Sequence, residues 1–277
     1  MNTNTPGTGT VSTATDAVAA TTAPRLSVQG LAKTYDTKKG AVPVIADLTF
    51  DVAAGEIVCI VGPSGIGKTT LLKCLTGLQS ISSGVALIDG KPIDGPPEEM
   101  ALVFQEYTRS LMPWLTVQKN VRLPLKHLHL PRAEREERIA AALTAVGLAG
   151  AEQKYPWQLS GGMQQRVAIA RAIAYRPEVL IMDEPFASVD AQTRFELEDL
   201  CLRIREQFGM TIVIVTHDID EAVYLSDRVV VLGERPARVT RTLDIDFGGA
   251  RDQITTRSLP EFAELRTEIL ELIRKAG

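Results

Sequence analysis

The sequence predicts an α/β fold built on a largely parallel sheet, and three observations lead to this prediction. Short runs that are almost entirely apolar and rich in β-branched residues are typical of strands buried on both faces; they occupy residues 56–61, 179–182, 211–215 and 227–232. Segments with helical patterns lie between these runs, and strands that alternate with helices form parallel sheets covered on both faces. The chain has 277 residues, 45% of them hydrophobic, which is enough for one large domain.

The composition narrows the classes of protein. The net charge is −4, so a basic face for nucleic acid is not expected. The three cysteines do not suit a disulfide framework and fit a reducing cytosol, and Cys59 and Cys74, with apolar neighbours, are predicted to be inert core thiols. No window approaches the roughly 18 consecutive apolar residues of a membrane span, and the N-terminus lacks a secretory signal. We therefore expect a cytosolic protein that other subunits would anchor at a membrane.

The pattern along the chain predicts three consecutive segments. Residues 1–24 are rich in Thr, Ala, Ser and Gly and are predicted to form a disordered tail. Residues 25–245 form the main domain, within which about 110–174 have helical patterns and no convincing strand, as in an inserted helical subdomain. Residues 246–277 form a C-terminal extension with an amphipathic helix at 260–275, which we expect to pack on its own core.

A phosphate-binding loop follows the first buried strand. The pattern G-x-x-x-x-G-K-[ST] occurs as Gly62, Pro63, Ser64, Gly65, Ile66, Gly67, Lys68 and Thr69. A strand before it and a helical run after it supply the context that the motif requires, which argues against a chance glycine-rich turn. Glycines let backbone N–H groups turn towards an anion, and a helix N-terminus favours negative charge. Lys68 is predicted to contact nucleotide phosphates, and the Thr69 hydroxyl to ligate Mg²⁺.

Two acidic residues, Asp183 and Glu184, stand at the end of the predicted strand 179–182. Ligands bind beyond the carboxyl ends of parallel strands. Asp183 is therefore placed to hold Mg²⁺, directly or through water, and Glu184 to orient and deprotonate a water molecule. An acidic pair alone is equally compatible with a strand cap; the phosphate loop upstream favours the catalytic interpretation.

A second glycine motif opens a helix that runs to about Tyr175. It consists of Leu159, Ser160, Gly161, Gly162, Met163, Gln164, Gln165 and Arg166. Ser160 is a favourable N-cap, and the two glycines leave the first N–H groups of the helix accessible to an anion. A plain helix cap would explain this motif by itself, but the chain would then carry two phosphate-type sites far apart in sequence.

Together these motifs resemble the ABC ATPase family, and the resemblance runs from about Leu26 to Glu234. Tyr35 matches the aromatic residue that stacks on adenine, and Gly62 to Thr70 match the Walker A segment. Gln105 matches the Q-loop glutamine, and the motif that begins at Leu159 matches the signature, which is nearly unique to this family. The other matches are the Walker B strand ending at Glu184, the D-loop Asp190 and the switch His217.

The resemblance implies a P-loop NTPase core with a mainly parallel sheet, an antiparallel β subdomain and an inserted helical subdomain. It also implies ATP and Mg²⁺ as cofactors and a head-to-tail homodimer, in which each ATP lies between Walker A of one chain and the signature of the other. Ser160, Gly161 and Gly162 would then contact the γ-phosphate bound by the partner. His217 would orient the water of Glu184, and Gln105 would act at the metal and the reaction centre.

Two features lie outside this pattern. Val189 precedes the D-loop aspartate, where relatives usually carry leucine or a similar larger residue; we do not expect inactivation, but the departure puts the dimer contact at Val189 in doubt. His127 and His129 have no supporting context and are predicted to be linker residues rather than metal ligands.

The stretch from Gln105 to Trp114 mixes aromatic, Met and Arg residues, which is typical of binding hot spots. It is predicted to dock on separate permease subunits, with core positions for Leu111 and Trp114 as the alternative. With residues 113–117 and 234–236, it resembles the nitrate, sulfonate and taurine importer subfamily, which also serves pyrimidine-like vitamin precursors. That implies a bacterial importer at the cytoplasmic face of the inner membrane, with a periplasmic binding protein as indirect partner.

Other ABC classes fit the sequence less well. A chromosome-organising ATPase would insert a long coiled coil between Gln105 and Ser160, where only 54 residues lie. A translation-associated protein would carry two cassettes, and a P-loop kinase would lack the signature. The alternative that stays open is an exporter ATPase with a separate permease.

Overall fold

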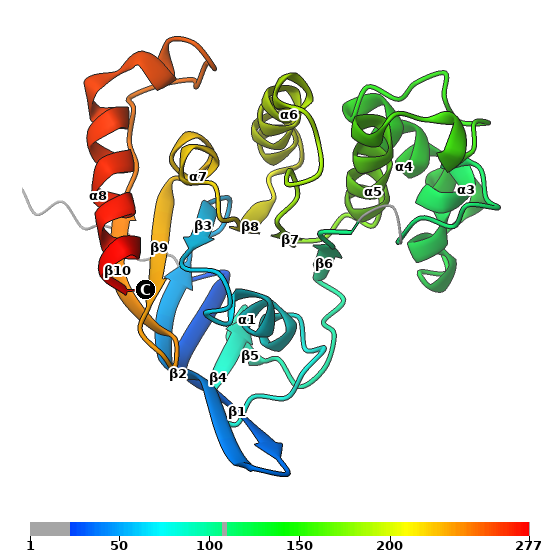
Figure 1. The fold of residues 1–277 in the computed structure, drawn as a ribbon. Coiled ribbons are helices and arrows are strands. Elements are labelled where there is room, and N and C mark those ends of the chain that lie inside the picture. Colours follow the sequence, from blue (N-terminus) through cyan, green and yellow to red (C-terminus); the bar gives the residue numbers. More distant parts are fainter. Residues whose placement is uncertain (1–22, 107–109, 277) are drawn as a thin grey trace, which may run out of the picture.

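The computed structural model describes residues 23–106 and 110–276, which form one arrangement of two sheets and surrounding helices (Figure 1). Residues 1–22 of the predicted disordered tail lie outside the described residues. Of that segment only Ala23 and Pro24 are described, and they lead directly into the first strand.

The larger sheet has six strands and carries the site. Its order is β10-β9-β3-β8-β7-β6, and all neighbouring pairs are parallel except β9 with β10. The four predicted strands are confirmed as its centre, where nearly every side chain is buried. The bounds are β3 Ile57–Val61, β6 Met100–Val103, β7 Val179–Asp183, β8 Thr211–Val215, β9 Arg228–Gly233 and β10 Arg238–Asp244.

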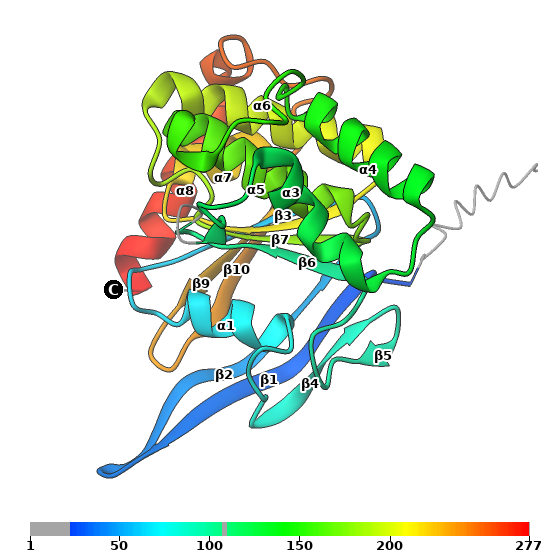
Figure 2. The same ribbon diagram turned by 90° about the vertical axis from the view of Figure 1, so that its right-hand side faces the viewer.

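The smaller sheet is antiparallel, with the order β2-β1-β4-β5. Helix α1, Lys68–Leu75, packs between the two sheets, because its apolar side chains share a core with alternate residues of β3, β7 and β8 and with β1 and β2 (Figure 2). Strands β1 and β2 thus pack against the helix that follows the phosphate loop. Their bounds are β1 Leu26–Thr37, β2 Gly40–Val52, β4 Ser83–Ile88 and β5 Lys91–Pro92.

A group of helices lies to one side of the larger sheet (Figure 1). Between residues 110 and 174 every described element is helical, as the sequence predicts. Leu111 is only 2% exposed and belongs to the core, which removes it from the predicted docking surface, whereas Trp114 is 70% exposed. The elements are α3 Val117–Arg122, η1 Leu123–His127, α4 Arg132–Ala145, η2 Pro156–Gln158 and α5 Gly161–Ala174.

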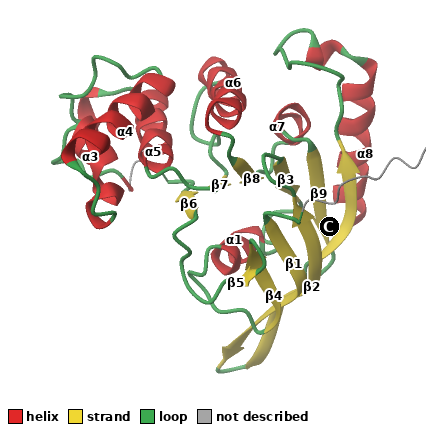
Figure 3. Ribbon diagram, turned by 180° about the vertical axis from the view of Figure 1, so that it is seen from behind, coloured by secondary structure: helices red, strands yellow, loops and turns green. Residues whose placement is uncertain are grey.

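The C-terminal helix packs on the chain's own core, in agreement with the sequence-based expectation. Helix α8, Pro260–Ala276, lies beside α7, Ile219–Leu225, and strand β9 (Figure 3). Phe262 and Ile269 are buried, and the remaining apolar face packs against the same core. A short turn, η3 Thr256–Ser258, precedes α8.

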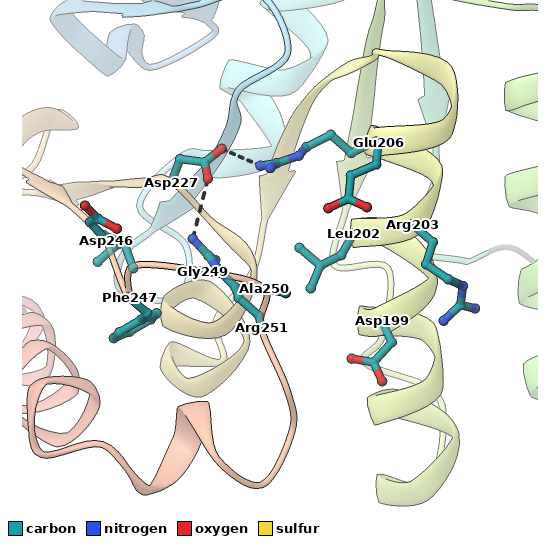
Figure 4. Close-up of a pocket in the computed structure, with 12 residues that line it drawn as sticks. Asp199, Leu202, Arg203, Glu206, Asp227, Asp246, Phe247, Gly249, Ala250 and Arg251 are labelled. Atoms are coloured by element: carbon teal, nitrogen blue, oxygen red, sulfur yellow. Dashed lines mark hydrogen bonds and ion pairs between the residues drawn. The ribbon is translucent and has the colours of Figure 1, made fainter.

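The start of the extension is attached to α6, Ala191–Phe208, by ion pairs around a cavity of about 380 Å³ (Figure 4). Asp227 accepts from Arg205 of α6 at 2.7 Å and faces Arg251 of the extension at 3.5 Å. Arg251 also donates to the Tyr224 carbonyl at 2.6 Å. The extension therefore belongs structurally to the helical layer that covers this face of the sheet.

Arg257 makes the most buried of these contacts. Its guanidinium donates to Glu198 of α6 at 2.7 Å, and the Glu198 side chain is fully buried. The guanidinium also lies over the rings of Phe195, Tyr224 and Phe262, between 4.9 and 5.8 Å from their centroids. Burial raises the pKa of Glu198, and the charge of Arg257 acts in the opposite direction. Gln253 also donates to Glu198 at 2.9 Å, but the cation that faces this buried carboxylate is Arg257.

Replacing this arginine, Arg257→Ala, is expected to lower the free energy of unfolding by about 3 kcal/mol, because removing one partner of a buried pair leaves an uncompensated charge. Chemical denaturation measures the loss. The matched control is Arg241→Ala, whose exposed pair with Glu268 is 4.0 Å long and whose loss should cost about 0–1 kcal/mol. Equal stability of the two variants would show that Arg257 does not hold the extension in place.

Candidate active site

The phosphate loop is shaped by close packing at its start and an unusual backbone at its end. A Cβ on Gly62 would lie 2.7 Å from the Leu232 carbonyl oxygen, so only glycine fits where the loop leaves β3. Gly67 caps α1 with φ +114°, a conformation that side chains disfavour. The loop therefore ends at the N-terminus of α1, and backbone N–H groups at such a position favour phosphate. The positions between them are Pro63, Ser64, Gly65 and Ile66.

Lys68 is folded back into this loop. Its ammonium donates to the carbonyl oxygens of Gly62 at 2.8 Å and Pro63 at 3.2 Å. Burial lowers the pKa of Lys68, and the negative charges of Glu184 and Asp183 oppose that shift. The cation is thus already held at the loop, near the two carboxylates that the sequence predicts at the same site.

Thr69 and Asp183, the predicted magnesium ligands, lie close enough for the Thr69 hydroxyl to affect the pKa of Asp183. The pKa of Asp183 is raised, mainly by burial and then by the negative charge of Glu184. Lys68 and the Thr69 hydroxyl act to lower it. A divalent cation would favour the ionised carboxylate in the same way as Lys68. A hydroxyl and a carboxylate are oxygen ligands of the kind that Mg²⁺ takes, so these two residues fit that ion.

Glu184 meets two of the other predicted residues. The Gln105 amide donates to Glu184 Oε2 at 2.8 Å, and His217 Nδ1 lies 3.2 Å from the same oxygen. Glu184 has φ +43°, which is uncommon for a residue with a side chain, and its N–H donates to the Val215 carbonyl at 2.8 Å. The backbone thus turns sharply after β7 and places the carboxylate between the segments that follow β6 and β8.

Tyr35 reaches the same region from β1. Its hydroxyl donates to Gln79 Oε1 at 2.9 Å and lies 3.5 Å from the Thr70 hydroxyl of α1, and the Lys33 ammonium lies 5.3 Å from the ring centroid. The antiparallel sheet thus presents an aromatic ring beside the phosphate-loop helix. The sequence does not identify Gln79 and Lys33 as site residues, because only the fold brings them next to Tyr35.

The second glycine motif does not join this cluster. Ser160 caps α5 as predicted, its hydroxyl accepting from the Met163 N–H at 3.3 Å, and Ser160 and Gly161 are exposed. At Gly162 any Cβ would collide with Thr193 of α6, so the close approach of these helices explains that glycine. Helix α5 lies in the lateral helical group and α1 between the sheets (Figures 1 and 3). The signature helix N-terminus therefore faces solvent.

Asp190 also lies apart from the phosphate loop. It caps α6, accepting from the Thr193 N–H at 3.0 Å and from the Thr193 hydroxyl at 2.8 Å, and these bonds lower its pKa. The side chain is exposed, and the preceding Val189 packs against the core. The sequence-predicted residues thus form one group around Lys68 and Glu184, and a second, exposed group at the starts of α5 and α6.

Comparison with known proteins identifies the class. The family model described as ABC transporter matches residues 45–187. An uncharacterised ABC transporter ATP-binding protein of Methanocaldococcus jannaschii is 46% identical over 90% of this chain and 91% of its own. A nitrate import ATP-binding protein of Synechococcus elongatus is 43% identical, over 87% and 88% of the two chains. A taurine import ATP-binding protein of Chromobacterium violaceum is 42% identical, over 91% and 95%.

Solved structures agree. The protein cbiO1 of Clostridium perfringens, part of an ABC transporter complex, superposes with a TM-score of 0.73 at 32% identity, over 80% of this chain and 88% of that one. An ATP-binding cassette solved as a dimer with ADP and phosphate gives 0.69 at 31% identity, over 80% and 99%. The chain belongs to the ABC transporter family and has the fold of its ATPase cassettes. Within the described residues, no helix has both the length and the apolarity needed to cross a membrane.

Proposed function

We propose that this chain is the ATP-hydrolysing subunit of a bacterial importer for a small solute such as nitrate, a sulfonate or taurine. The observation that carries the catalytic part is the convergence of Gln105 and His217 on the Glu184 carboxylate, close to the buried Lys68 and Asp183. Relatives named for nitrate and taurine import support the transport part.

The chemistry follows from these positions. Tyr35 stacks on the adenine, and Lys68 leaves its carbonyl partners for the β- and γ-phosphates of ATP, where the loop N–H groups also bind. Thr69 and Asp183 would hold Mg²⁺, with Gln105 as a further ligand, and the ion would neutralise phosphate charge. Glu184 accepts the proton of the attacking water, and His217 orients that water and contacts the γ-phosphate.

The exposed residues at the starts of α5 and α6 favour a dimer. Ser160 and Gly161 are exposed at the N-terminus of α5, a position that suits an anion, and with Gly162 they lie away from their own phosphate loop. A head-to-tail homodimer brings them to the γ-phosphate bound by the partner chain, with Asp190 near the shared nucleotide. One solved cassette of this fold forms a dimer with ADP and phosphate bound, which supports this arrangement.

The remaining partners follow from the transport role. The cassette docks on integral-membrane permease subunits at the cytoplasmic face of the inner membrane, as a peripheral protein, and a periplasmic binding protein delivers the solute. No part of this function requires nucleic acid. Cargo does not reach the ATPase site, so the permease and the binding protein select it.

The function is tested with the purified chain alone and with a candidate permease. The chain alone should release phosphate from ATP with Mg²⁺ and stop when the metal is chelated. In vesicles containing the permease, ATP should drive transport of the solute towards the face that carries the ATPase subunit. This transport should require the binding protein. Transport in the opposite direction would identify an exporter instead, and no hydrolysis in either setting would refute the assignment.

Trp114→Ala is expected to weaken permease binding by about 30-fold, the loss that a buried aromatic hot spot of about 2 kcal/mol would give, and to leave the fold intact. Trp114 is 70% exposed beside the buried Leu111. The control is Trp157→Ala, because Trp157 is 71% exposed but stands before the signature. Co-purification and melting temperature are measured; a Trp114 variant that binds like the Trp157 variant contradicts the docking surface.

A further inference from the structure

Arg194 connects the exposed start of α6 with the loop that carries His217. It stands four residues after Asp190, one turn into the helix, and its side chain crosses to the next segment. Its Nη1 lies 2.8 Å from Asp218 Oδ2, and its Nε lies 3.5 Å from Glu221 Oε1. Asp218 directly follows His217, so this arginine holds the residue adjacent to the switch histidine.

The loop around His217 is fixed on both sides by the same carboxylates. The Thr216 hydroxyl donates to Glu221 at 2.6 Å and accepts from the Asp218 N–H at 3.0 Å. Asp218 Oδ1 caps α7, accepting from the N–H groups of Asp220 at 2.9 Å and Glu221 at 3.2 Å. Asp218 thus uses one carboxylate oxygen for α7 and the other for Arg194, while the His217 side chain is 57% exposed.

We propose that Arg194 is a positioning residue for ATP hydrolysis, which ties the His217 loop to the helix that begins at Asp190. The inference rests on the proposed roles of Glu184 and His217. Arginine suits this task because its planar guanidinium donates to Asp218 Oδ2 at 2.8 Å in a fixed direction, while its charge lies 3.5 Å from Glu221 Oε1. A shift of the first turn of α6 carries Arg194 with it, and through Asp218 it changes the 3.2 Å approach of His217 to Glu184.

A purely electrostatic role for Arg194 must be separated from this one. Glu221 is only 3% exposed, and burial, followed by the charges of Asp218 and Glu198, raises its pKa to about 7, while the Arg194 charge acts to lower it. Removing Arg194 therefore also removes the compensation of a buried carboxylate. The two roles differ in what happens once Glu221 carries no charge.

The test is a double-mutant cycle with Arg194→Met and Glu221→Gln, in which kcat and KM for ATP are measured at pH 7.5 and folding is checked by thermal melting. Loss of positioning should lower kcat about tenfold and leave KM within about twofold, because ATP still binds to the loop. The same drop in kcat should occur when Arg194→Met is made in the Glu221→Gln background. A drop that disappears in that background would show that Arg194 only neutralises Glu221 and would overturn the proposal, as would a change confined to KM.

Arg194→Lys gives a second, independent readout that does not leave the site without a cation. An ammonium is a point charge and cannot reproduce the fixed direction of the guanidinium contact with Asp218, so kcat should fall about fivefold. A lysine variant with the parent's kcat would mean that charge alone suffices, and the proposal would fail. If the parent chain shows no hydrolysis, or if Glu184→Gln hydrolyses normally, the proposed function itself fails; a normal parent with a normal Arg194 variant refutes only this inference.

Discussion

A chain carrying Glu184→Gln is expected to bind ATP as tightly as the parent and to hydrolyse it about 1000-fold more slowly, within the range that a lost general base costs. The glutamine has nearly the same shape and can keep the contacts with Gln105 and His217, which lie 2.8 and 3.2 Å from the carboxylate. It cannot accept the proton of the attacking water. With hydrolysis blocked and binding intact, an ATP-bound dimer should accumulate.

Phosphate release and size-exclusion chromatography with and without ATP measure the two effects. The matched control is Glu264→Gln on the exposed face of α8, which changes the same functional group far from the phosphate loop and should leave both quantities unaltered. Hydrolysis within about tenfold of the parent would rule out Glu184 as the base.

Two inactive variants, Lys68→Ala and Ser160→Arg, are expected to recover activity when they are mixed. Lys68→Ala removes the cation of the phosphate loop and should weaken ATP binding itself. Ser160→Arg keeps that loop but places a bulky side chain at the α5 N-terminus and removes a cap worth about 1 kcal/mol. In a head-to-tail dimer the mixed pair has both lesions in one site and an intact second site. Equal mixing should then restore about a quarter of the sites.

The outcome distinguishes shared from separate sites. If each chain used its own Ser160, both sites of every mixed dimer would be defective and mixing would restore nothing. A crosslink from position 160 to the phosphate loop then identifies the chain that is touched, in the Glu184→Gln background with ATP present. A crosslink between chains confirms the shared site, and a crosslink confined to one chain refutes it.

The sequence predicts those parts of the fold in which buried segments have a recognisable apolar pattern. Residues 57–61, 179–182 and 211–215 are almost entirely apolar, and all three are confirmed as central strands. The antiparallel sheet was expected only from the family resemblance, because residues 26–52 mix buried and exposed positions with irregular register. Leu111 was assigned to a docking surface and is core, since hydrophobicity alone does not distinguish a buried leucine from an interface leucine.

The motifs single out the residues of the candidate site, but they do not predict the contacts between them. The motifs mark Lys68 and Glu184, yet the return of Lys68 to the Gly62 carbonyl and the positive φ of Glu184 depend on the folded backbone. Arg194 has no motif: its partner Asp218 is 24 residues away in sequence and becomes a neighbour only when α6 and α7 pack together. Such long-range polar pairs follow from tertiary packing, which composition and periodicity do not encode.

The exposed start of α5 has a kinetic consequence. If the ATP site is shared as proposed, a solitary chain holds only part of it. The specific activity in dilute solution should then rise with protein concentration, because two chains must meet before either can react. A permease that carries two cassettes side by side replaces this encounter with a high effective concentration, without adding a single catalytic group. Under the proposed arrangement, assembly with the permease therefore sets the rate of ATP hydrolysis. Free subunits in the cell would hydrolyse little ATP.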